Sequence, residues 1–246
     1  MTYGLGSRTT RLAGLALWVR GTSLIITIDG PAGSGKSTVS KLLADRLHYQ
    51  YLDTGAMYRA VALQAKRQGT ALECEEKLRE LCHSLDLRFK TEGNEKRVFI
   101  GDEDVSSAIR APDIDLLSSS ISTIKGVRES MTALQRKMAR NENLIAEGRD
   151  MGTVVFPDAR FKFFITASSE VRTERRYLER ITRGERVLRD HVRRDLIKRD
   201  EQDRTRSIAP SIPAEDAIIV DTSYTTPEQV VEIILEKIKA RGGEAS

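Results

Sequence analysis

Residues 29–38 read DGPAGSGKST and directly follow the apolar run LIITI at residues 24–28. A short apolar run of this kind is typical of a buried strand, and the next stretch, STVSKLLADRL at residues 37–47, has the apolar spacing of a helix. Glycine adopts backbone conformations that other residues avoid, so the turn can bring several N–H groups close to one anion. The G-x-x-x-x-G-K-S spacing from Gly30 to Ser37, set between a strand and a helix, predicts a P-loop that holds a nucleoside triphosphate. An ordinary glycine-rich turn is the alternative, and the flanking strand and helix disfavour it.

Two side chains of this loop have an expected role beside phosphate. The N-terminus of the following helix carries a partial positive charge that favours an anion. Lys36 can reach the β- and γ-phosphates, and the hydroxyl of Ser37 can bind a Mg²⁺ ion that accompanies ATP. The residues expected to bind the triphosphate are Gly30, Pro31, Ala32, Gly33, Ser34, Gly35, Lys36, Ser37 and Thr38.

Short apolar runs alternate with longer amphipathic stretches over most of the chain. Further strands are expected around residues 48–52, 144–146, 161–165 and 217–220. A helix is expected over residues 56–67, closed by Gly69, and another over residues 127–140. Repeated strand-then-helix units imply a parallel sheet with crossover helices, so the fold class is α/β.

Residues 82–123 break this alternation. The segments LDLRFK at 85–90 and KRVFI at 96–100 are short and alternating, and TEGNE between them contains the Gly and Asn of a hairpin turn. A serine-rich stretch, LLSSSIST at residues 116–123, then leads into the helix expected at 127–140. The pattern predicts a small antiparallel insert in an otherwise parallel domain.

Composition excludes several classes of protein. The chain has 246 residues, a formal net charge of +4, 31% charged residues and no apolar run long enough to cross a bilayer. Its two cysteines and three histidines form neither a disulfide framework nor a zinc pattern, which fits a reducing cytoplasm. Thirteen arginines and two lysines face nine carboxylates between residues 160 and 206, which suggests an anionic ligand. Residues 1–23 contain arginines around a short apolar stretch and resemble a targeting segment only weakly, so we expect a disordered N-terminal extension or a start codon assigned too early.

A phosphotransferase needs a second anion site that faces the P-loop. The guanine-reading motif of a GTPase switch, Asn-Lys-x-Asp, does not occur in the sequence. Three stretches place an arginine near the end of a strand or helix, where ligands of open parallel sheets bind. They are residues 53–59 (DTGAMYR), 127–129 (VRE) and 147–152 (EGRDMG).

Four segments in this order closely resemble the bacterial-type cytidylate kinase family. They are DGPAGSGKST at 29–38, YLDTGAMYRA at 51–60, AEGRDMGTVVFPDA at 146–159 and RDEQDRTRSIAP at 199–210. The resemblance runs from about Ile25 to Glu236 and implies a five-stranded parallel P-loop kinase core, a small antiparallel insert that binds the nucleoside monophosphate, and a helical lid. On this basis the core is expected at residues 24–81 and 124–241, the lid at about 172–190 and the insert at 82–123.

The resemblance also implies the residues of the acceptor site. Arg59, Arg128 and Arg149 would bind the acceptor phosphate, with Asp53 and Thr54 nearby; Thr54 stands where the family more often has serine. Ser119, Arg128 and Asp150 would read the base, although Ser118 or Ser120 could take the place of Ser119. The sugar site would consist of Arg199, Asp203 and Arg206.

Two sets of these residues need further comment. Three pairs at i,i+4 spacing (Asp190 with Arg194, Asp195 with Arg199, Asp200 with Arg204) could simply stabilise an exposed helix, which is the alternative for the sugar-site residues. Arg175 and Arg176, on a lid helix expected over 168–180, would act with Lys36 on the transferring phosphoryl group, in the manner of arginine fingers.

The expected reaction is transfer of the γ-phosphoryl group of ATP to CMP and dCMP. A phosphate acceptor is already anionic near neutral pH, so the transfer needs no general base. A kinase of the same fold that acts on UMP or AMP is one alternative. A nucleotide-dependent RNA-binding module is another, which the low aromatic content and interleaved carboxylates disfavour. We therefore expect small-molecule substrates, no nucleic-acid or membrane partner, a monomer and a cytoplasmic location.

Overall fold

The computed structural model describes residues 23–92 and 95–243. Residues 1–22 of the expected N-terminal extension, and the tip of the expected hairpin at Gly93 and Asn94, lie outside this part. The described helices and strands in chain order are β1 (Ile25–Asp29), α2 (Lys36–Leu47), β2 (Gln50–Asp53), α3 (Thr54–Gln68), α4 (Glu75–Ser84), β3 (Leu87–Glu92), β4 (Glu95–Ile100), β5 (Glu103–Asp104), η2 (Ala108–Arg110), α5 (Pro112–Ile121), α6 (Lys125–Met138), β6 (Leu144–Gly148), η3 (Met151–Val155), β7 (Phe161–Thr166), α7 (Ser169–Thr182), α8 (Arg189–Thr205), β8 (Ile218–Asp221) and α9 (Pro227–Gly243).

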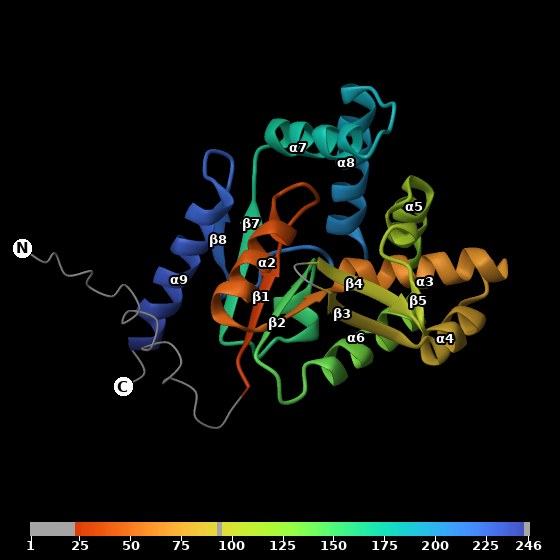
Figure 1. The fold of residues 1–246 in the computed structure, drawn as a ribbon, viewed down its shortest axis with the longest axis horizontal. Coiled ribbons are helices and arrows are strands. Elements are labelled where there is room, and N and C mark those ends of the chain that lie inside the picture. The colour runs from red at the N-terminus through yellow and green to blue at the C-terminus, as the bar shows by residue number, and fades with distance from the viewer. Residues whose placement is uncertain (1–22, 93–94, 244–246) are drawn as a thin grey trace, which may run out of the picture.

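The main sheet has five parallel strands in the order β2-β6-β1-β7-β8 (Figure 1). The chain therefore leaves β1, the central strand, to build one side of the sheet and crosses later to the other side. Ligands of open parallel sheets bind beyond the strand ends at such a switch point. The P-loop, which follows β1, lies at that place, and the predicted α/β class with a five-stranded parallel sheet is confirmed.

Helices cover both faces of the main sheet. Ile26 and Ile28 of β1 are fully buried on the face that packs against α2 and α9, together with Leu43 and Ile234. The alternate residues of the neighbouring strand β6, Leu144 and Ala146, are buried against the helices of the other face. Alternation of buried residues along a strand gives each face its own apolar core, and these two cores fix the sheet beneath the P-loop.

Residues after α4 form a second, antiparallel sheet of three strands, in the order β3-β4-β5. The sequence predicted the β3–β4 hairpin but not β5, which has only two residues. It also placed the serine-rich stretch as a lead into the following helix. The stretch does precede α6, but the sequence analysis did not predict that Ser118, Ser119 and Ser120 lie inside a helix of their own, α5, which has Pro112 in its first turn. Proline is well suited to a helix start, and the apolar Ile114 and Ile121 bury the inner face of α5.

The remaining boundaries differ only slightly from expectation. The second strand starts at Gln50 rather than at residue 48, since His48 ends α2 in the left-handed conformation. The helix expected at 56–67 extends over Thr54–Gln68 and is closed by Gly69 as predicted. The helix expected at 127–140 covers Lys125–Met138.

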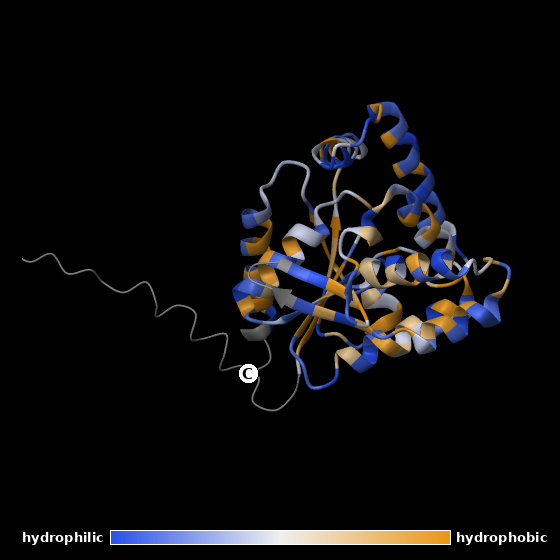
Figure 2. Ribbon diagram, turned by 45° about the vertical axis from the view of Figure 1, so that its right-hand side comes forward, coloured by the Kyte–Doolittle hydropathy of each residue, from blue (hydrophilic) through white to orange (hydrophobic). Residues whose placement is uncertain are grey.

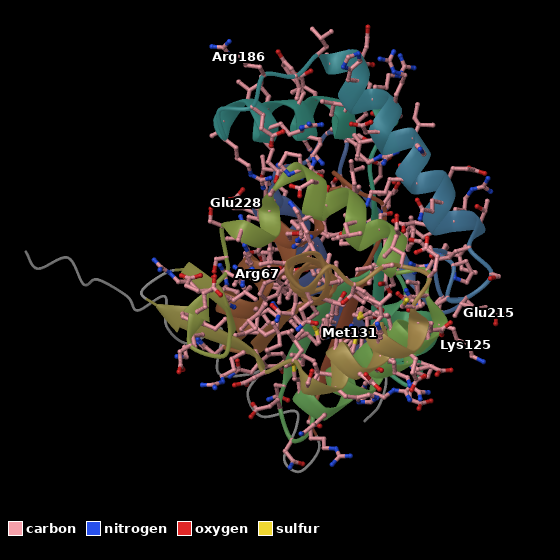
Figure 3. All side chains as sticks on the ribbon, turned by 90° about the vertical axis from the view of Figure 1, so that its right-hand side faces the viewer. Arg67, Lys125, Met131, Arg186, Glu215 and Glu228 are labelled. Carbon is pink, nitrogen blue, oxygen red and sulfur yellow. The ribbon has the colours of Figure 1, made fainter. Side chains whose placement is uncertain are left out.

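Helices α7 and α8 stand above the carboxyl end of the main sheet (Figure 1). Figure 2 shows that most of their surface is hydrophilic, whereas the strands below are hydrophobic. The loop between the two helices lies at the far end of the pair, where Arg186 projects outward, whereas Met131 of α6 lies within the core (Figure 3). None of the described helices is long and apolar enough to cross a membrane.

Candidate active site

The P-loop is shaped by glycines in conformations that other residues avoid. Gly30 has a φ of 145°, and a Cβ atom there would lie 2.0 Å from the backbone oxygen of Ile165 on the adjacent strand. Gly35 has a φ of 88° and immediately precedes α2. The loop can therefore pass close to the sheet and turn directly into a helix N-terminus, where backbone N–H groups remain available for an anion.

Lys36 is held inside this loop. Its Nζ donates a 2.7 Å hydrogen bond to the carbonyl oxygen of Pro31, and only 6% of the residue is exposed. Burial lowers the pKa of Lys36, and the nearby Arg149 lowers it further. A negatively charged phosphate beside the amine would oppose both effects, so the site favours an anionic ligand.

Ser37 on α2 lies beside a carboxylate that the sequence analysis did not single out. Its Oγ donates a 2.7 Å hydrogen bond to Glu147 Oε1, while Glu147 Oε2 is buried without a hydrogen-bond partner. Burial raises the pKa of Glu147, and the charge of Asp53 raises it further. A signal was present in the sequence, because Glu147 ends the apolar strand LIA, whose carboxyl end lies beside the end of the P-loop strand.

A cleft of about 860 Å³ extends from the P-loop to the helices on the other side. Ala32 to Thr38 line it, but Gly30 and Pro31 do not. The ten residues expected to bind the acceptor all line the same cleft, as do Arg175 and Arg176: Asp53, Thr54, Arg59, Ser119, Arg128, Arg149, Asp150, Arg199, Asp203 and Arg206. The structure thus brings together residues from distant parts of the sequence.

The most buried charges of the cleft surround Asp150. Its carboxylate accepts hydrogen bonds from Arg128 and, at 3.3 Å, from Arg206, and all three side chains are at most 5% exposed. Asp29 fixes the turn after Asp150, because its carboxylate accepts hydrogen bonds from the backbone N–H groups of Met151 at 2.9 Å and Gly152 at 2.8 Å. Burial raises the pKa of Asp29 to about 6 in spite of these hydrogen bonds.

A second group of charges lies next to Asp150 and its two arginines. Arg149 Nε donates to Asp203 Oδ2 at 2.9 Å, and Arg59 lies 3.4 Å from Asp53. Asp53 also caps α3, since its side chain accepts the N–H of Ala56. Helix α8 thus directs Asp203 into the cleft.

The i,i+4 pairs that the sequence allowed within α8 are not the contacts that Asp195, Arg199 and Asp200 form. Asp195 pairs with Arg180 of α7 at 3.4 Å and Asp200 pairs with Arg172, so these carboxylates join two helices. Arg199 in turn contacts Asp115 of α5.

Thr54 and the serines of α5 use part of their hydrogen-bonding capacity within the protein. Thr54 Oγ1 donates to the carbonyl oxygen of Glu147 at 2.7 Å. Ser118 Oγ donates to the carbonyl of Asp115 in its own helix, whereas Ser119 Oγ lies 3.4 Å from Gln202 Oε1 across the cleft. Ser118 and Ser119 line the cleft, together with Ser122.

The two arginines of the expected lid helix have different surroundings. Arg175 donates to the hydroxyl of Thr222 at 2.9 Å and to its carbonyl at 2.7 Å, and lies 3.4 Å from the carbonyl of Ser34 in the P-loop. Arg176 instead donates to Asp115 at 2.7 Å. The sequence analysis named both arginines but neither partner, because Thr222 and Asp115 come from distant segments.

Sequence comparison gives the family of the chain. The family model described as cytidylate kinase matches residues 26–240. The chain is 47% identical over 223 residues to the cytidylate kinase of Geobacter sp. (strain M21), covering 91% of this chain and 96% of that one. It is 42% identical over 217 residues to the cytidylate kinase of Thermotoga maritima, with 88% and 97% covered. The chain belongs to the cytidylate kinase family.

Comparison with solved structures supports the fold of this cytidylate kinase family member. An uncharacterized protein from Eubacterium ventriosum aligns with a TM-score of 0.50 and 13% identity, covering 88% of this chain and 99% of that one. At this identity the likeness concerns the fold alone. The family match confirms the resemblance that the four sequence motifs indicated.

Proposed function

We propose that the chain transfers the γ-phosphoryl group of ATP to CMP and dCMP, with ADP and CDP or dCDP as products. The observation that carries this proposal is that one cleft holds both the P-loop and a cluster of arginines, of which Arg128 and Arg206 are buried. An oxygen of the acceptor phosphate forms a bond to the γ-phosphorus, and the bond from that phosphorus to the β–γ bridging oxygen breaks. The electron pair of the broken bond leaves with ADP.

Two anionic nucleotides approach each other only where cations offset their repulsion. We assign Arg59, Arg128 and Arg149 to the acceptor phosphate, because planar guanidinium groups suit phosphate oxygens and all three line the cleft. Lys36 and the N–H groups of the P-loop take the phosphates of ATP. Catalysis then consists of alignment of the two phosphates and stabilisation of charge on the migrating group.

We assign recognition of cytosine to Asp150, with Arg128 and Ser119. The carboxylate of Asp150 accepts hydrogen bonds and is held by two buried arginines, so it can accept the exocyclic amino group of cytosine. Uracil presents a carbonyl at the same position, which cannot donate a hydrogen bond to that carboxylate and whose oxygen would be repelled by it. Arg199, Asp203 and Arg206 are assigned to the sugar.

The oxygen atoms beside the P-loop fit a Mg²⁺ ion. Magnesium prefers oxygen ligands and is commonly bound through one or two carboxylates together with substrate phosphates. The Ser37 hydroxyl and the Glu147 carboxylate, with its unpartnered buried Oε2, supply that chemistry. Ser37 and Glu147 would hold the ion, which when bound neutralises phosphate charge.

We assign residues 82–123 as the insert that binds the acceptor and about 172–190 as a lid. Arg175 and Arg176 of α7 line the cleft above the P-loop and would contact the transferring phosphoryl group. Closure of α7 over bound nucleotides would also exclude water and so suppress hydrolysis of ATP.

A coupled assay of ADP formation with CMP, dCMP, UMP and AMP tests the proposal. We expect the highest kcat/KM with CMP and dCMP. A preference for AMP would refute the assignment of the base site, and the absence of transfer to any monophosphate would refute the function. Steeply salt-dependent binding of RNA without transfer would instead favour the RNA-binding alternative.

A further inference from the structure

One carboxylate oxygen in the cleft joins two arginines from different helices. Asp115 Oδ2 accepts a hydrogen bond from Arg176 on α7 at 2.7 Å and another from Arg199 on α8 at 2.9 Å. The side chain of Asp115 is 21% exposed, and those of the arginines are 25% exposed. Asp115 itself belongs to α5, which packs against α3 on the other side of the cleft.

Neither arginine uses all its donors in these contacts. Arg176 directs its other terminal nitrogen to Glu179 at 2.8 Å, while Arg199 Nε is buried without a hydrogen-bond partner. A guanidinium group has five N–H donors in a fixed plane, so one bond to a carboxylate orients the plane and leaves donors for a ligand. Asp115 therefore orients both groups without occupying them fully.

The bonds of Asp115 cross the cleft. Within the described residues, side-chain hydrogen bonds join α5 to the α7–α8 pair only through Asp115 and through Ser119 with Gln202, where both distances are 3.4 Å. Arg175, by contrast, is tied to Thr222 and the P-loop. Arg176 is thus held by a residue of α5, which lines the part of the cleft assigned to the acceptor. Arg175 is held beside the P-loop, which is assigned to ATP.

We propose that Asp115 is a positioning residue that holds Arg176 and Arg199 against α5, the helix on the acceptor side of the cleft. It would in this way couple acceptor binding to phosphoryl transfer. The inference rests on the proposed function, since it takes Arg176 to act on the migrating phosphoryl group and Arg199 on the acceptor sugar. Preorganised cations are the main source of catalysis in phosphoryl transfer, and small displacements of such groups reduce the rate strongly.

The charge state of Asp115 agrees with this role. Burial alone would raise the pKa of Asp115, but Arg199 and Arg176 lower it to about 2. The side chain is therefore anionic throughout the physiological pH range.

A double-mutant cycle tests whether Asp115 acts through Arg176. We expect Asp115→Ala to lower kcat at least about tenfold while the KM for ATP changes less than about threefold. In an Arg176→Ala background the same change should lower kcat less than about twofold, because Arg176 is the partner through which Asp115 acts on the phosphoryl group; loss of its bond to Arg199 should instead raise the KM for CMP. Asp113→Ala on the same helix is the matched control, since Asp113 forms an exposed pair with Lys66, and it should retain the wild-type kcat. Losses that multiply fully in the double variant would overturn the proposal.

Amide hydrogen exchange tests the same link without turnover. Loss of the hydrogen bond from Arg176 to Asp115 should speed amide exchange in α7 peptides of Asp115→Ala. Exchange in the same peptides of Asp113→Ala should equal that of the wild type. Equal α7 exchange in Asp115→Ala and the wild type would contradict the link. A wild-type protein that does not phosphorylate CMP would overturn the proposed function and with it the catalytic effect of Asp115. An active wild type whose Asp115→Ala variant has the same kcat would overturn the role of Asp115 alone.

Discussion

Ser37 and Glu147 are 110 residues apart in sequence, and their side-chain oxygens lie 2.7 Å apart. The contact follows from the sheet, because β1 and β6 are parallel neighbours whose carboxyl ends meet at Asp29 and Gly148. The first turn of α2 therefore comes to rest beside the last residues of β6. This places a hydroxyl and a carboxylate next to the loop that is assigned to the phosphates of ATP.

Glu147→Gln should raise the Mg²⁺ concentration needed for half-maximal rate. The substitution keeps the size of the side chain and an acceptor for Ser37, but removes the negative charge assigned to the ion. We expect kcat to fall at least about tenfold at low Mg²⁺ and to recover partly at high Mg²⁺. The rate is measured over a Mg²⁺ titration, with the exposed Glu142→Gln as control. A titration identical to the wild type would remove Glu147 from the ion site.

Lys36→Met should lower kcat at least about a hundredfold, since it removes a cation aimed at developing charge while it keeps the apolar stem. Steady-state turnover with CMP measures the effect, and circular dichroism checks the fold. Lys125→Met, at the start of α6 where 69% of the Lys125 side chain is exposed, should have no effect. Turnover of the Lys36 variant within tenfold of the wild type would refute the assignment.

Asp150→Asn should reduce kcat/KM more with CMP than with UMP. The amide can turn its NH₂ group toward the carbonyl of uracil, which the carboxylate cannot do, so the CMP to UMP ratio should fall at least about tenfold. Asp158→Asn, an exposed position downstream, is the control. Equal losses with both nucleotides would mean that Asp150 only orients Arg128 and Arg206.

Asp115→Asn should lower the stability of the protein in a pH-dependent way. The pKa of Asp115 lies at about 2 in the folded protein against an ordinary value of 3.8, so its ionised form stabilises the fold above about pH 4. The difference corresponds to about 2 kcal/mol at pH 7. Urea unfolding of both proteins should show this gap at pH 7, with its gradual loss as the pH falls from about 4 to about 2. A gap that stays constant down to pH 2 would contradict the ion pairs of Asp115.

The sequence alone predicted those parts of the site that depend on local pattern. The P-loop, its strand and its helix lie within about twenty residues of one another, and their glycine spacing has one clear physical meaning. The α/β fold class followed from the alternation of short apolar runs with longer amphipathic stretches. The assignment of Arg59, Arg128 and Arg149 to the acceptor required the resemblance, because an isolated arginine is usually a surface residue.

Other features could not be predicted because they depend on contacts between distant segments. Asp115 meets Arg176 only when α5 faces α7 and α8, and Thr222 meets Ser34 only when the residue after β8 reaches the P-loop. Strand β5 has two residues, too few for a period, and is defined by its pairing with β4. The serines of α5 suggest a loop, but burial of Ile114 and Ile121 overrides their weak helix propensity.

The central claim is that the two nucleotides meet in the cleft between the P-loop and the buried arginines. A crystal structure with an ATP analogue and CMP tests it most directly. We predict the CMP phosphate among Arg59, Arg128 and Arg149, with its base at Asp150 and the triphosphate along Gly33 to Thr38. A CMP molecule bound outside this cleft, far from Lys36, would contradict the account.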